Sequence, residues 1–447
     1  METPFLTPWA LRLTAFCLIA ALGSGGLAAQ SAAPRPSVED LRAYIDAYPR
    51  GRFLPQAKAL LKSLQEETVD GRFAEAGPTD APFAAALSQA VSTLFANAPA
   101  PATGATLVLD PVVDGLSGLR TVATSAMDNR VGELIRAEHP QFRIQAFTEF
   151  GAAATRYVLI GTFTGINKQR KPTGERLTFR IWLSLIDRDS GNVVAKVKVF
   201  AQPRGVDISP TRFFRDSPAW TADVAMQTYI KSCQATKPGD PADPRYLERI
   251  KAAALINEAI GYYESGAYQR SRSLFRAAAD APGGDQLRTY NGLYLTSWKL
   301  GESDRAAEAF SRLLDLGLAQ GALALKFRFK PGTADFVLDP DSGAQHQLWL
   351  TRISDALAPR GDCLDIIGHP QRTAAGEAPD DLGVQRADYV RRRLQLENPA
   401  LSGRLRVMDG GVDDTLVGSA TADAADALDR RIEFRAKVCP PTSASLQ

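Results

Sequence analysis

A short internal repeat constrains the fold of this chain more than any other feature. Gly266 and Gly301 lie 35 residues apart, and Phe275 and Phe310 have the same separation. A period of roughly 20–50 residues is typical of supersecondary units that bury a hydrophobic face by stacking on their neighbours. Each glycine stands where we expect a turn between two helices, and each phenylalanine stands in the helix that follows. The spacing predicts two stacked helical hairpins over residues 246–320.

The period and layout of these hairpins resemble tetratricopeptide repeats, whose units have about 34 residues. The resemblance implies either a groove that binds protein partners or a spacer between domains, and both interpretations stay open. A further segment, residues 37–66, has two helical stretches separated by Pro49-Arg50-Gly51 and also resembles one such hairpin. Because a single hairpin leaves a hydrophobic face uncovered, we expect it to pack on another part of the protein.

The length and charge of the chain limit the classes of protein to which it can belong. At 447 residues it is too long for one ordinary hydrophobic core, and its length suggests about three domains. A net charge of +2 gives no general attraction for nucleic acid, and no cluster of basic residues interleaved with aromatic residues occurs. We therefore expect no nucleic-acid partner.

The first residues differ in composition from the rest of the chain. Arg12 precedes an apolar run over residues 13–22, and small residues follow in "GSGGLAAQ". This combination is typical of a secretory signal peptide. At about 1.5 Å per residue the run spans only ~15 Å, which is too short to cross a bilayer as a helix. We predict that residues 1–29 are a signal peptide and that the mature chain has no transmembrane span.

The mature chain would keep an odd number of cysteines, namely Cys233, Cys363 and Cys439. Export to an oxidising compartment permits disulfides, but an odd number leaves at least one cysteine free or paired outside the chain. Cys363 opens an expected strand and Cys439 closes the last one. If those strands are antiparallel neighbours, the two cysteines can form a disulfide. The alternative is three unpaired cysteines that pack as small hydrophobic residues.

Residues 105–232 have the pattern of a small mixed-sheet α/β domain. The stretches "TLVLDPV", "FRIQAF" and "RYVLIGTFTGI" have the apolar content of strands, and an amphipathic helix separates the first two. A long hairpin follows, formed by "FRIWLSLID", the turn "RDSG" and "NVVAKVKVF". In its second arm Lys196 and Lys198 alternate with apolar residues. The alternation predicts a half-buried strand with both lysines on the face opposite the core.

Two stretches of this domain, "YVLIGTFT" and "LIDRDSGNVVA", carry a resemblance to a known family. They are similar to the corresponding strand and hairpin of the curli-secretion lipoprotein and of the TolB amino-terminal domain. The alternative is an unrelated α/β sandwich. The cluster "RFFRDSPAW" (residues 212–220) predicts a packed cap on this domain rather than a ligand site.

The last part of the chain, residues 323–440, predicts four strands and two helices. The first strand is expected over residues 323–336, where apolar and basic residues alternate, and the last strand is "DRRIEFRAKV". Three stretches occur in an order typical of the OmpA-like carboxy-terminal domain: "IIGHPQ", "LGVQRADYV" and "DRRIEF". The chain resembles that family, which has an α/β sandwich fold and binds the peptide stem of peptidoglycan.

The resemblance implies a ligand site for diaminopimelate, which carries an ammonium and a carboxylate on one carbon. Arg386 stands where the family has an arginine that holds the carboxylate through a charge-assisted pair. His369 stands at the position that fastens the loop after the strand. Where the family has an aspartate for the ammonium, this chain has Gln371, and losing a charged partner costs ~1.5–3 kcal/mol. The substitution puts wall binding in doubt.

Other positions of the motif also enter the implied site. Asp429 and Arg430 stand in the third stretch, where Asp429 replaces the usual asparagine and offers one way to restore a negative charge. The alternative role for Arg386 is a surface salt bridge to Asp381 or Asp388. The candidate ligand contacts are therefore Arg386, Gln371, His369, Asp429 and Arg430.

No motif indicates a reaction. The chain has no P-loop, no nucleotide-binding glycine motif after a strand, no nucleophile elbow and no zinc-protease motif. Its three histidines are scattered, whereas zinc and copper sites need clustered ligands. We therefore expect no catalytic residues, no metal and no cofactor, and we expect that the protein is not an enzyme.

These observations predict a multi-domain α/β plus α-helical protein of the periplasm, associated with the cell wall or the outer membrane. In the first hypothesis it binds peptidoglycan through the OmpA-like domain and protein partners through the helical repeats. In the second it is a scaffold of an envelope or secretion assembly whose OmpA-like domain no longer binds the wall.

Overall fold

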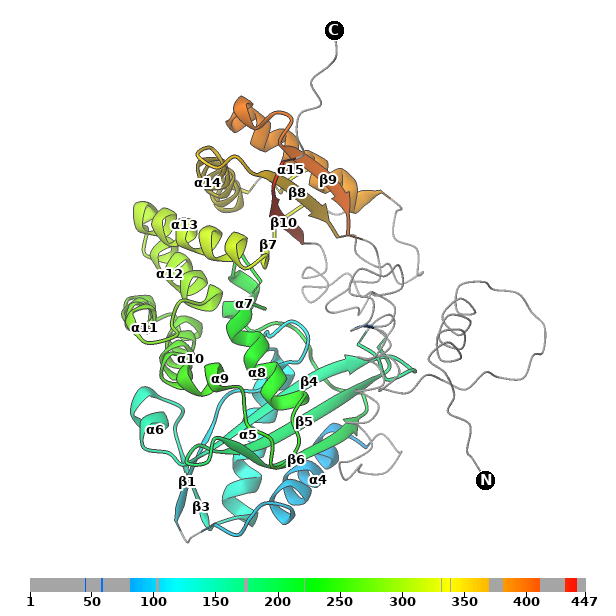
Figure 1. The fold of residues 1–447 in the computed structure, drawn as a ribbon, viewed down its shortest axis with the longest axis vertical. Helices are drawn as coiled ribbons and strands as arrows, with labels where there is room; N and C mark the ends of the chain where they lie inside the picture. Colours follow the sequence, from blue (N-terminus) through cyan, green and yellow to red (C-terminus); the bar gives the residue numbers. More distant parts are fainter. Residues whose placement is uncertain are drawn as a thin grey trace, which may run out of the picture. The chain divides into compact units, whose positions relative to one another are not determined.

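The computed structural model describes residues 45, 58, 81–101, 104–172, 176–220, 222–330, 332–337, 339–369, 381–410 and 431–439 (Figure 1). The chain divides into two compact units, residues 1–73 and residues 74–447. The predicted signal peptide (residues 1–29) falls outside the described residues, and so does the predicted hairpin at residues 37–66 apart from Ile45 and Lys58. All elements below belong to the second unit.

A mixed sheet with helices on both faces forms the first part of this unit (Figure 1). Its strands are β1 (Ala105–Leu109), β2 (Val113–Asp114), β3 (Phe142–Gln145), β4 (Tyr157–Ile166), β5 (Thr178–Asp187) and β6 (Asn192–Ala201). The order is β3-β1-β4-β5-β6, with β2 beside β4. Strand β1 is parallel to β3 and β4, whereas β4, β5 and β6 are antiparallel.

Three helices of this part cover the sheet from opposite sides, namely α4 (Phe83–Ala96), α5 (Val122–Glu138) and α8 (Val224–Gln234). The short helix α6 (Glu149–Ala153) lies against α10, which is described below. Helices α4 and α5 share one hydrophobic core with alternate residues of the strands, among them Leu183 and Val197. On the other face α8 is tied to the strands by hydrogen bonds, including one from the Ser184 hydroxyl to the Cys233 carbonyl at 3.0 Å.

The two lysines of β6 lie on the face opposite the core that contains Ala195 and Val197, as predicted, but the strand is not half-buried. Lys196 and Lys198 are only 3% and 1% exposed. The ammonium of Lys196 donates to the carbonyls of Gln234 and Thr236 at 2.8 and 2.6 Å, at the carboxyl end of α8, and lies 4.5 Å from the Trp182 ring centre. A helix terminus stabilises a cation in this way. The face is buried because α8, some thirty residues later in the chain, packs on it.

Two helical hairpins follow, as the repeat predicted. The helices are α9 (Pro244–Glu248), α10 (Ile250–Glu264), α11 (Tyr268–Asp280), α12 (Leu287–Lys299) and α13 (Ser303–Ala319). Gly266 and Gly301 lie between the helices of each pair with φ of 83° and 73°, a backbone conformation that favours glycine. No atom lies within 4 Å of a Cβ built on either glycine. Their role is therefore the turn itself rather than close approach of the two backbones.

The cluster at residues 212–220 caps the hairpins instead of the α/β sheet. Helix α7 (Arg212–Asp216) carries Phe213, whose ring centre lies 5.6 Å from those of both Tyr263 and Phe275. The side chain of Asn291 then pairs with both backbone groups of Ala219, at 3.2 and 3.0 Å. The prediction of a packed segment is right, but the surface that it covers belongs to α10, α11 and α12.

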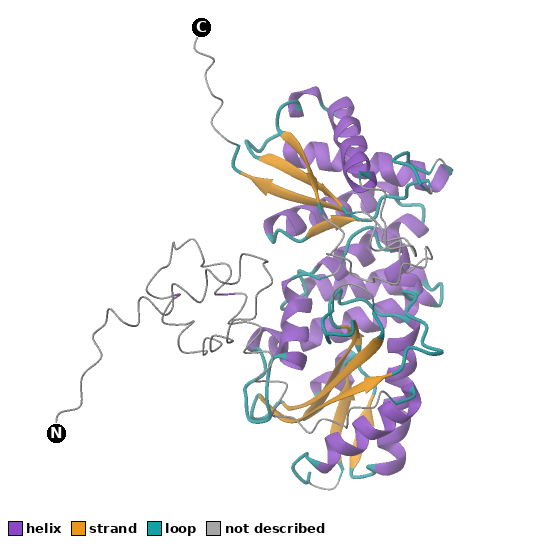
Figure 2. Cartoon of the chain, turned by 90° about the vertical axis from the view of Figure 1, so that its right-hand side faces the viewer, coloured by secondary structure: helices purple, strands orange, loops and turns teal. Residues whose placement is uncertain are grey.

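The last part contains a second, smaller sheet. Its elements are β7 (Leu323–Leu325), α14 (Pro340–Leu357), β8 (Cys363–Gly368), α15 (Leu382–Glu397), η1 (Pro399–Leu401), β9 (Leu405–Asp409) and β10 (Ile432–Lys437). The order is β7-β10-β8-β9, with β10 antiparallel to β7 and β8, and β8 parallel to β9. Figure 2 shows the strands of the two sheets apart from each other, with helices around each. The predicted fold class, α/β plus α-helical, is confirmed.

The first strand of this sheet is shorter than predicted. It ends at Leu325, and the next residue turns back toward α7, since the Lys326 ammonium donates to the Phe214 carbonyl at 2.6 Å. Burial lowers the pKa of Lys326 to about 7. The alternation of apolar and basic residues predicted a longer strand because it carries no information about this contact.

One continuous hydrophobic core joins the hairpins to the second sheet. It extends from Phe213 and Tyr263 through Phe310 and Trp349 to Phe434. The rings of Phe310 and Trp349 stack at 5.7 Å, and the Trp349 indole N–H donates to the Tyr294 hydroxyl at 2.9 Å. The part of the chain after residue 323 therefore shares its core with the hairpins and is not packed as a separate body.

A disulfide joins Cys363, at the start of β8, to Cys439, two residues beyond the end of β10. The two strands are antiparallel neighbours, and the Cα atoms of the cysteines are 4.8 Å apart. This is the first of the two alternatives given by the sequence. Cys233 is free and fully buried between α8, to which it belongs, and the larger sheet.

The mature protein is expected to show one thiol when it is denatured without reductant and three after reduction, because only Cys233 lies outside the disulfide. Thiol titration with intact-mass measurement checks both numbers. A retained leader would add the thiol of Cys17. Cys233→Ser should leave no thiol before reduction, and three thiols in unreduced, exported protein would contradict the pairing.

Candidate functional site

The start of α15 lies close against the end of β8. A Cβ on Gly368, the last residue of β8, would collide with the carbonyl of Gly383 in the first turn of α15. Glycine at this position therefore allows the strand end and the helix to meet. The next turn of the helix carries Arg386, the principal residue of the predicted ligand site.

Arg386 points into the protein. It is 3% exposed, its Nε donates to the Thr333 carbonyl at 3.0 Å, and its guanidinium carbon lies 5.0 Å from the Phe329 ring centre. A surface salt bridge is therefore not its role, and Asp388 pairs instead with two other arginines of α15, Arg391 and Arg392. The segment between β7 and α14 holds the guanidinium.

His369 is also buried, at 3% exposed, and it fastens the end of β8 to β10. Its backbone N–H donates to the Arg431 carbonyl at 3.2 Å, and its Nε2 lies 3.0 Å from Glu433. Arg431 and Arg435 also contact the Glu433 carboxylate, each at 2.8–2.9 Å. Burial opposes ionisation of Glu433, but His369 and Arg431 outweigh it and lower its pKa to about 2.

The other predicted contacts, Gln371, Asp429 and Arg430, lie outside the described residues. Of the predicted set, the structure thus places Arg386 and His369, and both are tied to their own chain. Neither presents a charged group to solvent.

A groove of 820 Å³ that the sequence did not predict lies at the carboxyl ends of β1 and β3. In open α/β sheets, ligands bind in the crevice outside the carboxyl ends of parallel strands. The strand ends form its floor, and α5 and α10 form its walls. It is lined by Leu109, Pro111, Arg120, Asp128, Asn129, Gly132, Glu133, Arg136, Ile144, Gln145, Ala146, Phe147, Thr148, Asn257, Glu258, Gly261, Tyr262, Glu264 and Ser265.

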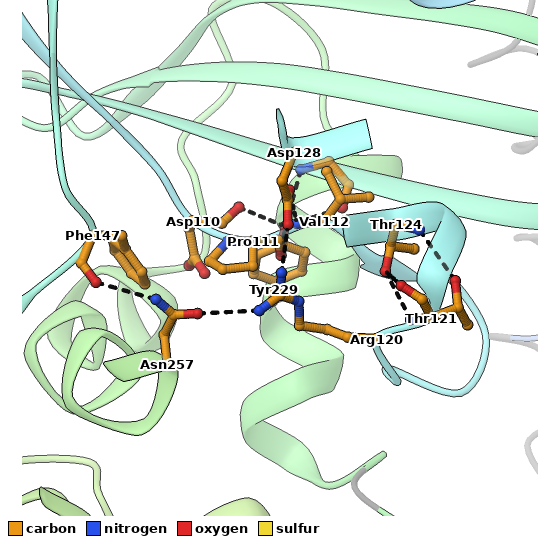
Figure 3. A network of polar contacts seen from close by, with 11 residues as sticks. Asp110, Pro111, Val112, Arg120, Thr121, Thr124, Asp128, Phe147, Tyr229 and Asn257 are labelled. Atoms are coloured by element: carbon orange, nitrogen blue, oxygen red, sulfur yellow. Dashed lines mark hydrogen bonds and ion pairs between the residues drawn. The ribbon is translucent and has the colours of Figure 1, made fainter. Parts of the chain in front are cut away.

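A chain of polar contacts fixes the walls of this groove, and Figure 3 shows Asn257 between Arg120 and Phe147. Asp128 accepts from the backbone N–H of Val112 at 2.8 Å and pairs with Arg120 at 2.8 Å. Arg120 also donates to the Asn257 side chain at 3.3 Å, and Asn257 donates to the Phe147 carbonyl at 3.2 Å. The network links α5, α10 and the loop after β3.

The beginning of α5 determines the position of Asp128, the acidic residue of this network. Thr121 caps the helix, and the side chains of Thr121 and Thr124 exchange hydrogen bonds with each other's backbone N–H groups (Figure 3). A capping box of this kind fixes where a helix begins. It places Asp128 on the side of α5 that faces the end of β1.

A second carboxyl group lies beneath the groove. Asp110, which directly follows β1, is 8% exposed and accepts a hydrogen bond from the Tyr246 hydroxyl at 2.9 Å. Burial raises the pKa of Asp110 to about 7, and burial also raises the pKa of Asp128 to about 6. Asp110 itself does not line the groove.

The lining contains no histidine, cysteine or lysine, and its carboxylates, guanidinium groups, amides and hydroxyls offer charge and hydrogen bonds. The sequence predicted the strand that ends in "LDP", at the floor of the groove. It did not predict the contact of Arg120 with Asn257, because the two residues lie 137 positions apart and no local pattern connects them. Within the described ranges, no three or more histidine, cysteine, aspartate or glutamate side chains gather as a metal site would require. None of the helices described is both long and apolar enough to cross a membrane.

Comparisons with solved structures find similarity to single domains of other proteins. No family model matches the chain, and no curated protein matches it. Two structures of the periplasmic domain of Helicobacter pylori MotB, of residues 90–256 and 78–256, are each 16% identical. They cover 25% of this chain and 70% and 72% of their own, with TM-scores of 0.21 and 0.20. The LpoB C-terminal domain from Salmonella enterica is 16% identical over 27% of this chain and 98% of its own, with a TM-score of 0.21.

At TM-scores this low, the similarity gives no information about the function of this chain. The resemblances to tetratricopeptide repeats and to the OmpA-like and TolB-like families stay predictions from the sequence.

Asp110→Asn is expected to stabilise the protein at pH 8 and not at pH 4. The pKa of Asp110 is about 7 in the folded state against 3.8 when unperturbed, so its contribution to stability is present below about pH 4 and is lost as the pH rises through 7. The gain at pH 8 is at most about 4 kcal/mol, at about 1.4 kcal/mol per pKa unit. Thermal denaturation followed from pH 4 to pH 8 measures it.

Asp280→Asn, which removes an exposed carboxylate, controls for the change in net charge. Equal pH dependence of the melting temperature in Asp110→Asn and the unmodified protein would contradict the account of this buried carboxyl.

Proposed function

We propose that the protein is a non-enzymatic scaffold of the cell envelope that joins an α/β domain and a carboxy-terminal domain through helical hairpins. The observation that carries the proposal is the continuous core from Phe213 through Phe310 and Trp349 to Phe434. A shared core of this kind fixes the relative positions of the parts that contribute to it, because interiors are close-packed and resist deformation.

The hairpins fit the role of a spacer better than that of an open groove for a partner. Phe213 and Phe214 of α7, both 0% exposed, fill the space against Tyr263 and Phe275. Trp349 of α14 covers the other hairpin at Phe310. The chain thus occupies with its own residues the apolar surfaces that a partner peptide would need.

Export of the protein is part of the proposal. The amino-terminal apolar run has the composition of a signal peptide, and the disulfide between Cys363 and Cys439 suits an oxidising compartment such as the periplasm.

Docking on peptidoglycan is the second candidate function. The position of Arg386 beside the end of β8, where Gly368 meets Gly383, favours it. The burial of Arg386 opposes it. A carboxylate of the peptide stem would have to replace the Thr333 carbonyl as the partner of Arg386, and it would have to reach a side chain that is only 3% exposed. Gln371 in place of an aspartate also removes the charge for the ammonium. We therefore place wall binding second.

The mature full-length protein is expected not to sediment with insoluble peptidoglycan above the level of an unrelated protein. The full chain is needed because the carboxy-terminal domain shares its core with the hairpins. Gln371→Asp restores the missing charge, and Gln385→Asp makes the same change on the exposed side of α15 as its control. Quantitative immunoblotting of pellet and supernatant measures retention.

Retention of the unmodified protein that free diaminopimelate abolishes would overturn the scaffold proposal in favour of wall docking. Retention of Gln371→Asp alone would show that the pocket persists but lacks its acid. Cross-linking in cells should then recover protein partners, and recovery of muramyl peptides instead would count against the scaffold.

A further inference from the structure

The groove between α5 and α10 has an excess of negative charge. Arg120 and Asp128 neutralise each other at 2.8 Å. Glu133 pairs with Arg130 of the same helix at 3.2 Å. The charged residues of the lining that remain are Glu258, Glu264 and Arg136, which makes two carboxylates against one guanidinium. Lining of this composition favours a cationic group over an anionic one.

One of these carboxylates lacks a donor. The Oε1 atom of Glu264 is buried and receives no hydrogen bond from the residues that the structure describes. Glu264 ends α10 and lines the groove. A buried acceptor without a donor costs free energy, so a donor that enters the groove is stabilised there.

The part of α10 that lines the groove has a residue without a side chain near its middle. Gly261 stands in the interior of α10, and no atom lies within 4 Å of a Cβ built on it. Glycine in a helix interior costs about 1 kcal/mol relative to alanine, and neither packing nor a turn requires it here. Its effect is on shape, because any side chain at this position would project into the groove.

An exposed aromatic residue lies near the rim. Phe150 of α6 is 85% exposed, two residues beyond Thr148, which lines the groove. Helix α6 is held to α10 by the ion pair of Glu149 with Lys251 at 2.8 Å. An exposed phenylalanine beside a polar groove fits a protein partner better than a free small cation, which has no apolar surface to place on it.

We propose that this groove binds a short basic segment of a partner protein, whose lysine or arginine reaches Glu258 and Glu264 and whose apolar neighbour packs on Phe150. The volume of 820 Å³ is within the range of pockets for small ligands, which is enough for one or two side chains of such a segment. The Arg120–Asp128–Asn257 network holds both walls in place before the ligand arrives, which lowers the entropy cost of binding. The site lies between the α/β part and the first helical hairpin, and no residue of the carboxy-terminal domain lines it.

A displayed library of random heptapeptides tests the proposal on the full-length mature protein. Selection on the unmodified protein, with removal of peptides that also bind Gly261→Leu, should enrich sequences with a lysine or arginine next to an apolar residue. Gly261→Leu fills the groove, and it should keep or raise the melting temperature because leucine favours helix more than glycine does. Failure to enrich basic residues, or identical selections on both proteins, overturns the proposal.

Fluorescence anisotropy with one enriched peptide then assigns the residues. Glu264→Gln and Glu258→Gln should each weaken binding roughly 10- to 100-fold, as for loss of a charge-assisted hydrogen bond. Phe150→Ala should weaken binding as well. Gly343→Leu is the control for Gly261→Leu and should leave the affinity unchanged, because Gly343 is an exposed glycine of α14 with equally open surroundings. Unchanged affinity in both glutamine variants, or displacement of the peptide by spermidine at equal concentration, excludes a partner-protein segment as the ligand.

Discussion

The packing of Trp349 on the second helical hairpin is the contact on which the rest of the structure depends. Its ring stacks on Phe310, and its indole N–H donates to the buried Tyr294 hydroxyl at 2.9 Å. Trp349 thus buries its apolar ring and still satisfies the hydrogen bond of its N–H group, as aromatic residues with a polar atom can do. Because α12 and α13 carry two of these three residues and α14 carries the third, the contact joins the hairpins to the smaller sheet.

The groove lies beside the first helical hairpin, away from the contact of Trp349 with the second hairpin. Helix α10 belongs to the first hairpin, and the contacts of Asn257 with Arg120 and the Phe147 carbonyl hold it against the larger sheet. Sites between structural layers are common because each layer supplies one wall. The contacts that hold the first hairpin against the larger sheet therefore also form the groove.

Several elements were predictable because their causes are local. The hairpin turns at Gly266 and Gly301 follow from a backbone conformation that favours glycine, and the strand and helix patterns follow from periods of two and 3.6. The errors have a common origin in distant contacts. Lys196 is buried because α8 covers it, and β7 ends early because Lys326 turns toward α7.

The sequence by itself determined the fold class, the two hairpins, the odd number of cysteines after the predicted signal peptide and the absence of a recognisable catalytic motif, since each depends on residue types and short spacings. Only the tertiary structure decided that Arg386 is buried against Phe329 and Thr333, and that Arg120 meets Asn257. Those contacts join residues 53 to 137 positions apart, and side chains so distant are brought together by packing of whole elements, which no local pattern encodes.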